Sequence, residues 1–309
     1  MSDKMIMIIG VTGSGKSRLA YDLAVSLEAE IVSIDSMKVY RGMDIGTAKP
    51  PIERRRQVKY HLIDVVDPWE SFSVSRFLEL SEAAIADIKS RGRSVVGAGG
   101  TAMYVKNMLY GLFEGPGSDH ELRNQLKDRY NTEGGLAMHK ELESVDPEAA
   151  ARIHPNDQRR IVRALEVFRL SGKPISSFQT QFSAPQPDPR WHVIGVRRAK
   201  EVESRRINSR VKKMIELGLV DEARRLYELE KPLSKQASVA IGYAELFEHF
   251  EGKLSLEKAI EKIKINTRRL AKSQRTWFKT FKNVHWIELE ESESPEQVLS
   301  KTLEHLRLF

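Results

Sequence analysis

The chain has 309 residues, no cysteine and a formal net charge of +7. The lack of cysteine excludes disulfide bonds, thiolate nucleophiles and cysteine-ligated metal centres. No window approaches the roughly 18 apolar residues that a membrane-spanning helix needs, and the first apolar run is too short for a signal peptide, so we expect a cytoplasmic protein. The positive charge hints at a polyanionic partner.

Short apolar runs alternate with amphipathic stretches over the first hundred residues. The predicted strands are 4–9, 30–34, 60–65 and 94–96, and the predicted helices are 16–27, 74–90 and one that begins at 104 and includes 110. Strands that alternate with helices in this way are typical of an α/β fold, a parallel sheet wrapped by helices.

The pattern changes near Gly115-Pro116-Gly117. From about 118 to 182 it is helical, and a proline-rich stretch follows at 184–189, after which 191–196 and 284–289 again resemble strands. We therefore predict an all-helical domain inserted into the α/β core, with glycine- and proline-rich joints. The predicted parts are 1–116 and 190–309 for the core, and 117–189 for the insertion.

A glycine-rich segment follows the first predicted strand. It matches G-x-x-x-x-G-K-[ST] at every fixed position, and it reads Gly10, Val11, Thr12, Gly13, Ser14, Gly15, Lys16 and Ser17. Such a loop points backbone amides at phosphate oxygens, aided by the helix N-terminus and the lysine, while the hydroxyl of Ser17 can bind Mg²⁺. The sequence thus predicts a P-loop NTPase-like core that binds a di- or triphosphate, and most proteins with this loop use ATP or GTP.

Two more strand ends carry groups suited to the same site. Asp35 follows the second strand, where it could hold Mg²⁺ or act as a general base, and Gly99-Gly100-Thr101 ends a later strand. The carboxyl ends of parallel strands meet at one edge of a sheet and form the ligand crevice there. We expect all three segments to form one site.

Positive charge is concentrated in two places. Residues 262–282 contain eight lysines and arginines and no acidic residue. At helical spacing one face carries Lys264, Arg268, Lys272, Arg275, Lys279 and Lys282, and the opposite face carries Ile260, Ile263, Leu270, Trp277 and Phe281. A second cluster consists of Arg152, Arg159, Arg160, Arg163 and Arg169. Two basic surfaces predict a clamp on a nucleic acid, without specifying DNA or RNA.

Three functions fit these residues. One is a small-molecule or nucleotide kinase that uses ATP, which leaves the basic helix and the insertion unexplained. Another is a group transferase with a diphosphate donor and a nucleic-acid acceptor. The third, a non-catalytic NTPase, requires a stronger Walker B strand than those ending at Asp35 and Asp64. The residues favour the transferase.

Several motifs together resemble the tRNA dimethylallyltransferases, also called tRNA isopentenyltransferases. Beyond the phosphate loop they are DSMKVYRGMDIGTAKP at 35–50, HLIDVVDP at 61–68, FSV at 72–74, GGTAMY at 99–104, RIHPNDQRRIVRALEV at 152–167, SGKP at 171–174, IGY at 241–243 and TRRLAKSQRTWF at 267–278. The resemblance covers nearly the whole chain.

The resemblance implies transfer of a dimethylallyl group from dimethylallyl diphosphate to N6 of the adenosine directly 3′ of the anticodon, in tRNAs that read codons beginning with U. It implies that residues 10–17 hold the diphosphate, that Lys16, Asp35 and Thr101 are catalytic with Asp35 as general base, and that Ser17 and Asp35 hold Mg²⁺. We expect a monomer with no obligate protein partner.

The resemblance also assigns contacts with the anticodon stem-loop. These would come from Asp35, Ser36, Met37, Lys38, Thr101, Arg123, Arg159, Arg160, Ile161, Val162, Arg163, Lys264, Arg268, Lys272 and Arg275. The chain departs from the family pattern at three positions. It has Lys38 where the family usually has glutamine, Val239 where arginine or glutamine is frequent, and Ser273 where a basic residue is usual.

Overall fold

The computed structural model describes residues 5–112, 115–178 and 187–307. The chain divides into two compact units. We call Met1–Leu109 with Pro187–Phe309 the core unit, and Tyr110–Gln186 the inserted unit. The predicted joints, at 116/117 and 189/190, lie a few residues from these boundaries. Lys4 of the first predicted strand, the end of the predicted helical stretch at 179–182 and residues 184–186 of the proline-rich stretch lie outside the described residues.

The core unit is built on a six-stranded sheet with the order β3-β2-β4-β1-β5-β6. The strands are β1 (Met5–Ile9), β2 (Glu30–Ile34), β3 (Tyr60–His61), β4 (Val95–Gly99), β5 (Trp191–Arg197) and β6 (Val284–Glu288). Every neighbouring pair is parallel, so the predicted parallel sheet is confirmed. β3 is shorter than the predicted 60–65 because Leu62 and Asp64 have positive φ angles of 61° and 58°, which an extended strand does not allow.

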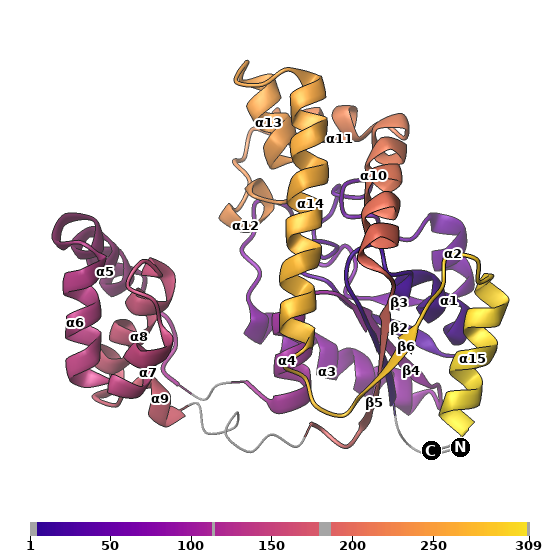
Figure 1. Ribbon diagram of the computed structural model, residues 1–309, viewed down its shortest axis with the longest axis horizontal. Coiled ribbons are helices and arrows are strands. Elements are labelled where there is room, and N and C mark those ends of the chain that lie inside the picture. The colour runs from indigo at the N-terminus through magenta and orange to yellow at the C-terminus, as the bar shows by residue number, and fades with distance from the viewer. Residues whose placement is uncertain (1–4, 113–114, 179–186, 308–309) are drawn as a thin grey trace. The chain divides into compact units, whose positions relative to one another are not determined.

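Helices cover both faces of this sheet, as a parallel sheet requires. α1 (Lys16–Ser26) and α15 (Pro295–Arg307) pack on one face through a core that includes Leu23, Ile194 and Val298. α3 (Val74–Ser90) and α4 (Ala102–Tyr110) lie on the other side of the strands (Figure 1). The short α2 (Ile52–Gln57) precedes β3. The oxygen of Ser73 accepts a hydrogen bond from the Arg76 amide and fixes where α3 begins.

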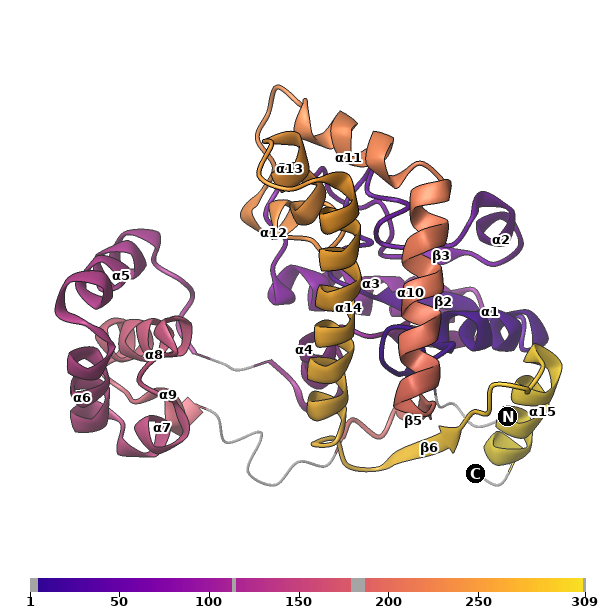
Figure 2. The same ribbon diagram turned by 45° about the horizontal axis from the view of Figure 1, so that its top comes forward.

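Five helices lie between β5 and β6. They are α10 (Lys200–Glu216), α11 (Leu219–Tyr227), α12 (Lys235–Ser238), α13 (Ala244–Phe250) and α14 (Leu256–Phe278). The long α14 runs beside α10 in both views (Figures 1 and 2). No helix in the described parts of the chain is long and apolar enough to cross a membrane.

The predicted apolar face of α14 is only partly right. The buried side chains are those of Ala259, Ile263, Ala271, Gln274 and Phe278. Leu270 is 41% exposed, so the buried face is rotated from the predicted one. The helix packs against both α10 and α13, and small or polar residues, not only large apolar ones, occupy its contact surface. The helix ends at Phe278, so Lys279 and Lys282 lie beyond it.

The inserted unit contains only helices among its described residues. They are α5 (His120–Glu133), α6 (Gly135–Val145), α7 (Pro147–Arg152), α8 (Gln158–Ser171) and α9 (Ile175–Phe178). Carboxylates of Asp119, Asp146 and Asp157 accept hydrogen bonds from amides in the first turns of α5, α7 and α8. These caps explain why one short segment contains so many separate helices. Leucine, methionine and alanine side chains form a core of its own.

Candidate diphosphate site

The glycine-rich loop joins β1 to α1 in a tight curl. Gly13 and Gly15 have φ angles of 88° and 103°, in the left-handed region that favours glycine. The carbonyls of Gly13 and Ser14 accept hydrogen bonds from Arg206 (2.9 Å) and Arg198 (3.1 Å). These contacts tie the loop to Arg198 and to α10. The loop leads into the N-terminus of α1, where the first amides have no intrahelical partner and attract anions.

Lys16 lies at the centre of this loop. Its Nζ donates a hydrogen bond to the carbonyl of Val11 at 3.3 Å. Burial, followed by the positive charges of Lys38 and Arg210, lowers the pKa of Lys16 to about 7, and the negative charge of Asp35 opposes this shift. Three positively charged side chains so close together indicate a site that binds an anion. A bound anion would raise the pKa of Lys16 again.

The ends of β2 and β4 are tied together beside the loop. Oδ1 of Asp35 accepts hydrogen bonds from the amides of Met37 (2.9 Å) and Lys38 (3.2 Å). Oγ1 of Thr101 accepts a hydrogen bond from the amide of Ser36 at 3.0 Å. Asp35 therefore shapes its own turn, and Thr101 positions that turn from the neighbouring strand.

The predicted meeting of the three segments at one edge is confirmed by the packing around Gly100. A Cβ atom at Gly100 would lie 3.3 Å from both the carbonyl oxygen of Gly10 and Cε of Lys16. A Cβ at Gly99 would lie 1.9 Å from the carbonyl oxygen of Ile34. Only glycine allows the β4 end to approach the loop and β2 this closely.

The side chain of Gln274 on α14 lies at the same edge of the sheet, a position that its sequence context did not predict. Its Oε1 accepts a hydrogen bond from the amide of Thr12 (2.8 Å), and its Nε2 donates one to the carbonyl of Gly100 (2.8 Å). The side chain is buried. The signal available in the sequence was a polar residue between Ala271 and Phe278 on the buried stripe of an amphipathic helix.

A cavity of about 480 Å³ opens beside the loop within the core unit. Its described lining contains no acidic residue, and its basic side chains are Lys16, Arg18, Lys38, Lys49, Arg54, Arg206, Arg210 and Lys213. Ser17 lines it as well, whereas Asp35 and Thr101 are not among the lining residues. Asp35 is nonetheless close, because its charge raises the pKa of Lys16, Lys38 and Arg210 against their burial.

Three of these basic residues come from α10, a helix for which the sequence motifs predicted no role in binding. Arg206, Arg210 and Lys213 are spaced by four and three residues, so they share one helix face. Burial lowers the pKa of Arg210, and Asp35 opposes that shift. The spacing was readable from the sequence, but only the fold shows that this face turns toward the phosphate loop.

Ala48, Lys49 and Pro50 of the GTAKP motif line the cavity, and the IGY motif supports this segment from outside the lining. The buried carboxylate of Glu222 accepts hydrogen bonds from the amides of Asp44, Ile45 and Gly46, and from the hydroxyl of Tyr243 at 2.7 Å. A Cβ at Gly46 would lie 2.6 Å from the Tyr243 ring. These motifs therefore hold the lining segment in place.

The basic face of α14 is less one-sided than predicted. Lys264 and Arg268 lie 3.2 and 3.5 Å from carboxylate oxygens of Glu261. Arg275 pairs with the buried Glu203 of α10. Glu261, just before this segment on the same helix, and Glu203 of α10 thus supply acids that the 262–282 segment lacks. The guanidinium of Arg275 thus neutralises a buried carboxylate, and its predicted contact with tRNA stays a prediction. Lys272 is exposed.

The residues of the inserted unit that were predicted to contact tRNA have different environments in the structure. Ile161 and Val162 are buried in its core, and their predicted contact with tRNA stays a prediction. Arg123 and Arg163 bind the buried Glu166 at 2.7 and 2.9 Å.

Although burial raises it, the hydrogen bonds from these two arginines lower the pKa of Glu166 overall. Arg123 thereby links α5 to α8, whereas Arg163 lies on α8 like Glu166 and donates hydrogen bonds to the carbonyls of Gly117 (3.1 Å) and Pro116 (2.7 Å). Arg159 and Arg160 are exposed. Val239, one of the departures from the family pattern, is 65% exposed.

Comparisons with known proteins point to one family. The sequence profile of the family described as IPP transferase matches residues 38–281. The tRNA dimethylallyltransferase of Geobacter metallireducens is 46% identical over 92% of each chain. That of Acetivibrio thermocellus is 40% identical, over 99% of this chain and 98% of the relative.

Solved structures agree as well. The tRNA isopentenylpyrophosphate transferase of Bacillus halodurans is 38% identical, with a TM-score of 0.70 over 99% of this chain and 97% of that one. A eukaryotic dimethylallyltransferase acting on tRNA is 27% identical, with a TM-score of 0.83 over 99% of this chain and 80% of that one. The chain therefore belongs to the IPP transferase family, and its curated relatives there are tRNA dimethylallyltransferases.

Proposed function

We propose that this protein is a tRNA dimethylallyltransferase. It transfers the dimethylallyl group of dimethylallyl diphosphate to N6 of the adenosine directly 3′ of the anticodon, in tRNAs that read codons beginning with U, and releases diphosphate. The observation that carries the proposal is the basic cavity beside the curled loop and Asp35, in a chain of this family. It supplies cations for a diphosphate and a carboxylate close to them.

The reaction breaks the bond between the allylic carbon and the diphosphate oxygen and forms a bond between that carbon and N6. Lys16, Lys38 and Arg210 bind the diphosphate and stabilise the charge that grows on the leaving oxygen. Asp35 accepts the proton that N6 loses as it becomes bonded to carbon. The hydrogen bonds from the Met37 and Lys38 amides keep the Asp35 carboxylate in place for this transfer.

The donor set suits a magnesium ion. The Ser17 hydroxyl and the Asp35 carboxylate offer the oxygen ligands that Mg²⁺ prefers, and Mg²⁺ commonly takes only one or two protein ligands together with phosphate oxygens. When bound, Mg²⁺ would neutralise part of the negative charge of the diphosphate. Ser17 is the second residue of α1, next to Lys16, so the same segment serves the ion and the diphosphate.

The tRNA meets exposed positive charge on both units. Lys272 of α14 and Arg159 and Arg160 of α8 are exposed and suit the phosphate backbone. Ser36, Met37 and Lys38 follow Asp35 and accompany the reactive adenosine. That base leaves its stack to reach a recessed site, as in other base-modifying enzymes, and anticodon-loop bases leave the stack at lower cost than paired ones.

The decisive experiment mixes the protein with Mg²⁺, total tRNA and dimethylallyl diphosphate labelled in the prenyl group. We expect label on an adenosine next to the anticodon. In the Asp35→Ala variant we expect transfer to fall by about 10²–10⁴-fold, the usual contribution of a general base, while tRNA and the diphosphate still bind.

The Asp35→Asn variant is the matched control for shape, since it retains an oxygen for the Met37 and Lys38 amides but is a far weaker base. Near-normal turnover in both variants would disprove the base assignment. Consumption of ATP with no label on tRNA would instead establish a kinase.

A further inference from the structure

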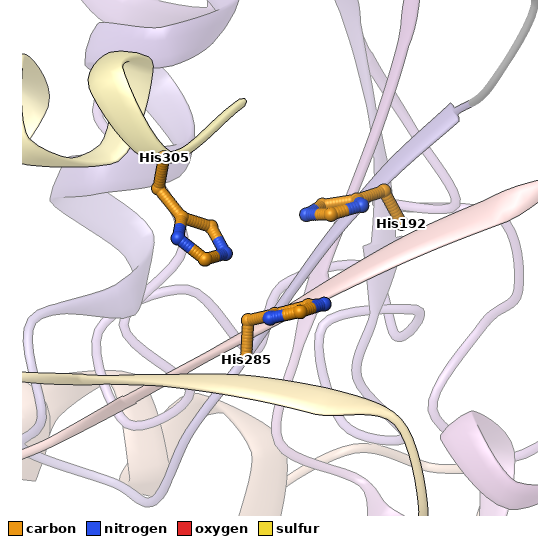
Figure 3. A group of neighbouring side chains, drawn as sticks. All are labelled: His192, His285 and His305. Carbon is orange, nitrogen blue, oxygen red and sulfur yellow. The ribbon is translucent and has the colours of Figure 1, made fainter. Parts of the chain in front are cut away.

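Three histidines meet on the core unit away from the diphosphate site. They are His192 of β5, His285 of β6 and His305 of α15 (Figure 3). Each offers a ring nitrogen, and these nitrogens all lie within 4.8 Å of one another. The rings of His192 and His285 are stacked with centroids 4.9 Å apart, and the centroids of His285 and His305 are 4.6 Å apart.

The fold explains the meeting. In the parallel pair of β5 and β6, Ile194 is opposite His285, so His192 lies one side-chain repeat away on the same face. That face continues through Val196 and Ile287, which pack under α15. The last turn of α15 then brings His305 over the two strands.

The histidines occupy the opposite edge of the sheet from the proposed reaction. His192 and His285 are each the second residue of their strand, near the amino ends. The phosphate loop and Asp35 follow the carboxyl ends of β1 and β2. Because all strands run in parallel, the two sets of residues lie at opposite ends of the strands.

The chemistry of the cluster fits a transition-metal ion. Neutral imidazole is the ligand form of histidine, and His192, His285 and His305 each offer one ring nitrogen to the same point. Bonds of about 2.0–2.1 Å to a tetrahedral ion place ligand nitrogens roughly 3.3 Å apart. The nitrogens lie up to 4.8 Å apart, so side-chain rotations that shorten these separations by roughly 1.5 Å would close the cluster around an ion. Imidazole groups suit Zn²⁺, Cu²⁺ or Ni²⁺, whereas Mg²⁺ prefers oxygen.

We propose that His192, His285 and His305 bind a transition-metal ion of the Zn²⁺ type, which ties the C-terminal helix α15 to β5 and β6. Three protein ligands leave a fourth position for water. The ion is a cross-link between the end of the chain and the sheet, and it takes no part in prenyl transfer.

Cobalt titration of the metal-free full-length protein tests the site. Co²⁺ replaces Zn²⁺ and reports a low-symmetry nitrogen site by visible absorption. We expect one equivalent to bind wild type with such bands, and at least a tenfold loss of affinity in His192→Gln, His285→Gln and His305→Gln. The control His120→Gln changes an exposed histidine of the inserted unit and should bind as wild type does. Wild type without the bands, or cluster variants that keep them, would overturn the proposal.

A second variant guards against loss by misfolding alone. The chain has no cysteine, so His305→Cys introduces a unique thiolate that gives a near-ultraviolet sulfur-to-cobalt charge-transfer band only if position 305 is a ligand. His120→Cys should give no such band with one equivalent of Co²⁺. Zn²⁺ should also raise the melting temperature of wild type and not of His305→Gln, because an ion that binds only the folded state stabilises it. A missing charge-transfer band in folded His305→Cys, or equal Zn²⁺ shifts in both proteins, would refute the site.

Discussion

Single side chains at the diphosphate site are held in place by backbone amides and carbonyls. Asp35 receives two amides of its own turn, and Thr101 receives a third from Ser36. These contacts fix a carboxylate next to several cations, and in the described parts of the chain no salt bridge joins it to any one of them. An unpaired geometry of this kind suits a group that must accept a proton during the reaction.

Lys16 gives the site a pH dependence. Because its pKa is about 7 before ligand binds, it is partly neutral above pH 7, and a bound diphosphate returns it to the charged form. Binding then takes up a proton, so affinity for dimethylallyl diphosphate should fall by up to about tenfold per pH unit as pH rises from about 7 to about 9. Below pH 7 the lysine is charged in both states, and this effect disappears. Calorimetric titrations without Mg²⁺ measure it.

The control is Lys16→Arg, since arginine stays charged across this range. Its binding is expected to be weaker but nearly independent of pH over the same interval. A flat profile for wild type, or the same slope in both proteins, would contradict the role given to Lys16.

At the scale of elements, the hydrophobic pattern predicted the bounds of helices and strands that depend on local sequence. β2 and α3 have the predicted bounds, 30–34 and 74–90. β4 extends to Gly99, beyond the predicted end at 96, although glycine weakens strands. Glycine is needed at position 99 because the neighbouring Ile34 carbonyl leaves no room for a side chain. Gln274 and Arg210 were missed for a related reason. Their roles depend on the phosphate loop and on Asp35, which are distant in sequence, and no local period encodes such contacts.

Gln274 should hold α14 against the phosphate loop. Gln274→Ala removes two hydrogen bonds and leaves the Thr12 amide and the Gly100 carbonyl without this partner, so unfolding free energy should fall by about 2–3 kcal/mol. Chemical denaturation measures the change, and affinity for the diphosphate should fall with it. Ser273→Ala alters an exposed neighbour on the same helix and should stay within about 0.5 kcal/mol of wild type. Equal stabilities of the two variants would exclude the bridging role.

The charges of α14 should separate into structural and RNA-binding groups. Arg275→Gln leaves the buried Glu203 uncompensated, so stability should fall on the order of 2 kcal/mol, less than for a fully buried pair because Arg275 is partly exposed. Lys272→Gln should leave stability unchanged and weaken tRNA binding, with a smaller salt dependence because one phosphate contact fewer releases counterions. Denaturation curves and binding at several salt concentrations test both variants. The reverse pattern would refute this division.

At the scale of the whole molecule, the chain forms two compact units, and in the sequence glycine and proline interrupt the hydrophobic pattern near the places where the chain leaves and re-enters the α/β core. The core unit contains the entire loop, the cavity and Asp35, and the inserted unit has its own apolar core. The chain leaves and re-enters the core unit at nearly the same point, since the amide of Asp188 donates a hydrogen bond to the carbonyl of Leu109 at 2.7 Å.

That proximity makes the two proposed tasks experimentally separable. Replacing residues 110–186 with a short glycine-serine linker should preserve the core unit, because a few residues are enough to join ends that already share a hydrogen bond. The shortened protein should bind dimethylallyl diphosphate within about threefold of wild type, since every described cavity residue remains. Its affinity for tRNA and its transfer activity should fall by at least tenfold, because Arg159 and Arg160 are removed. Calorimetry and filter binding measure the two affinities, and a folded variant that modifies tRNA at the wild-type rate would show that the inserted unit is not part of the RNA-binding surface.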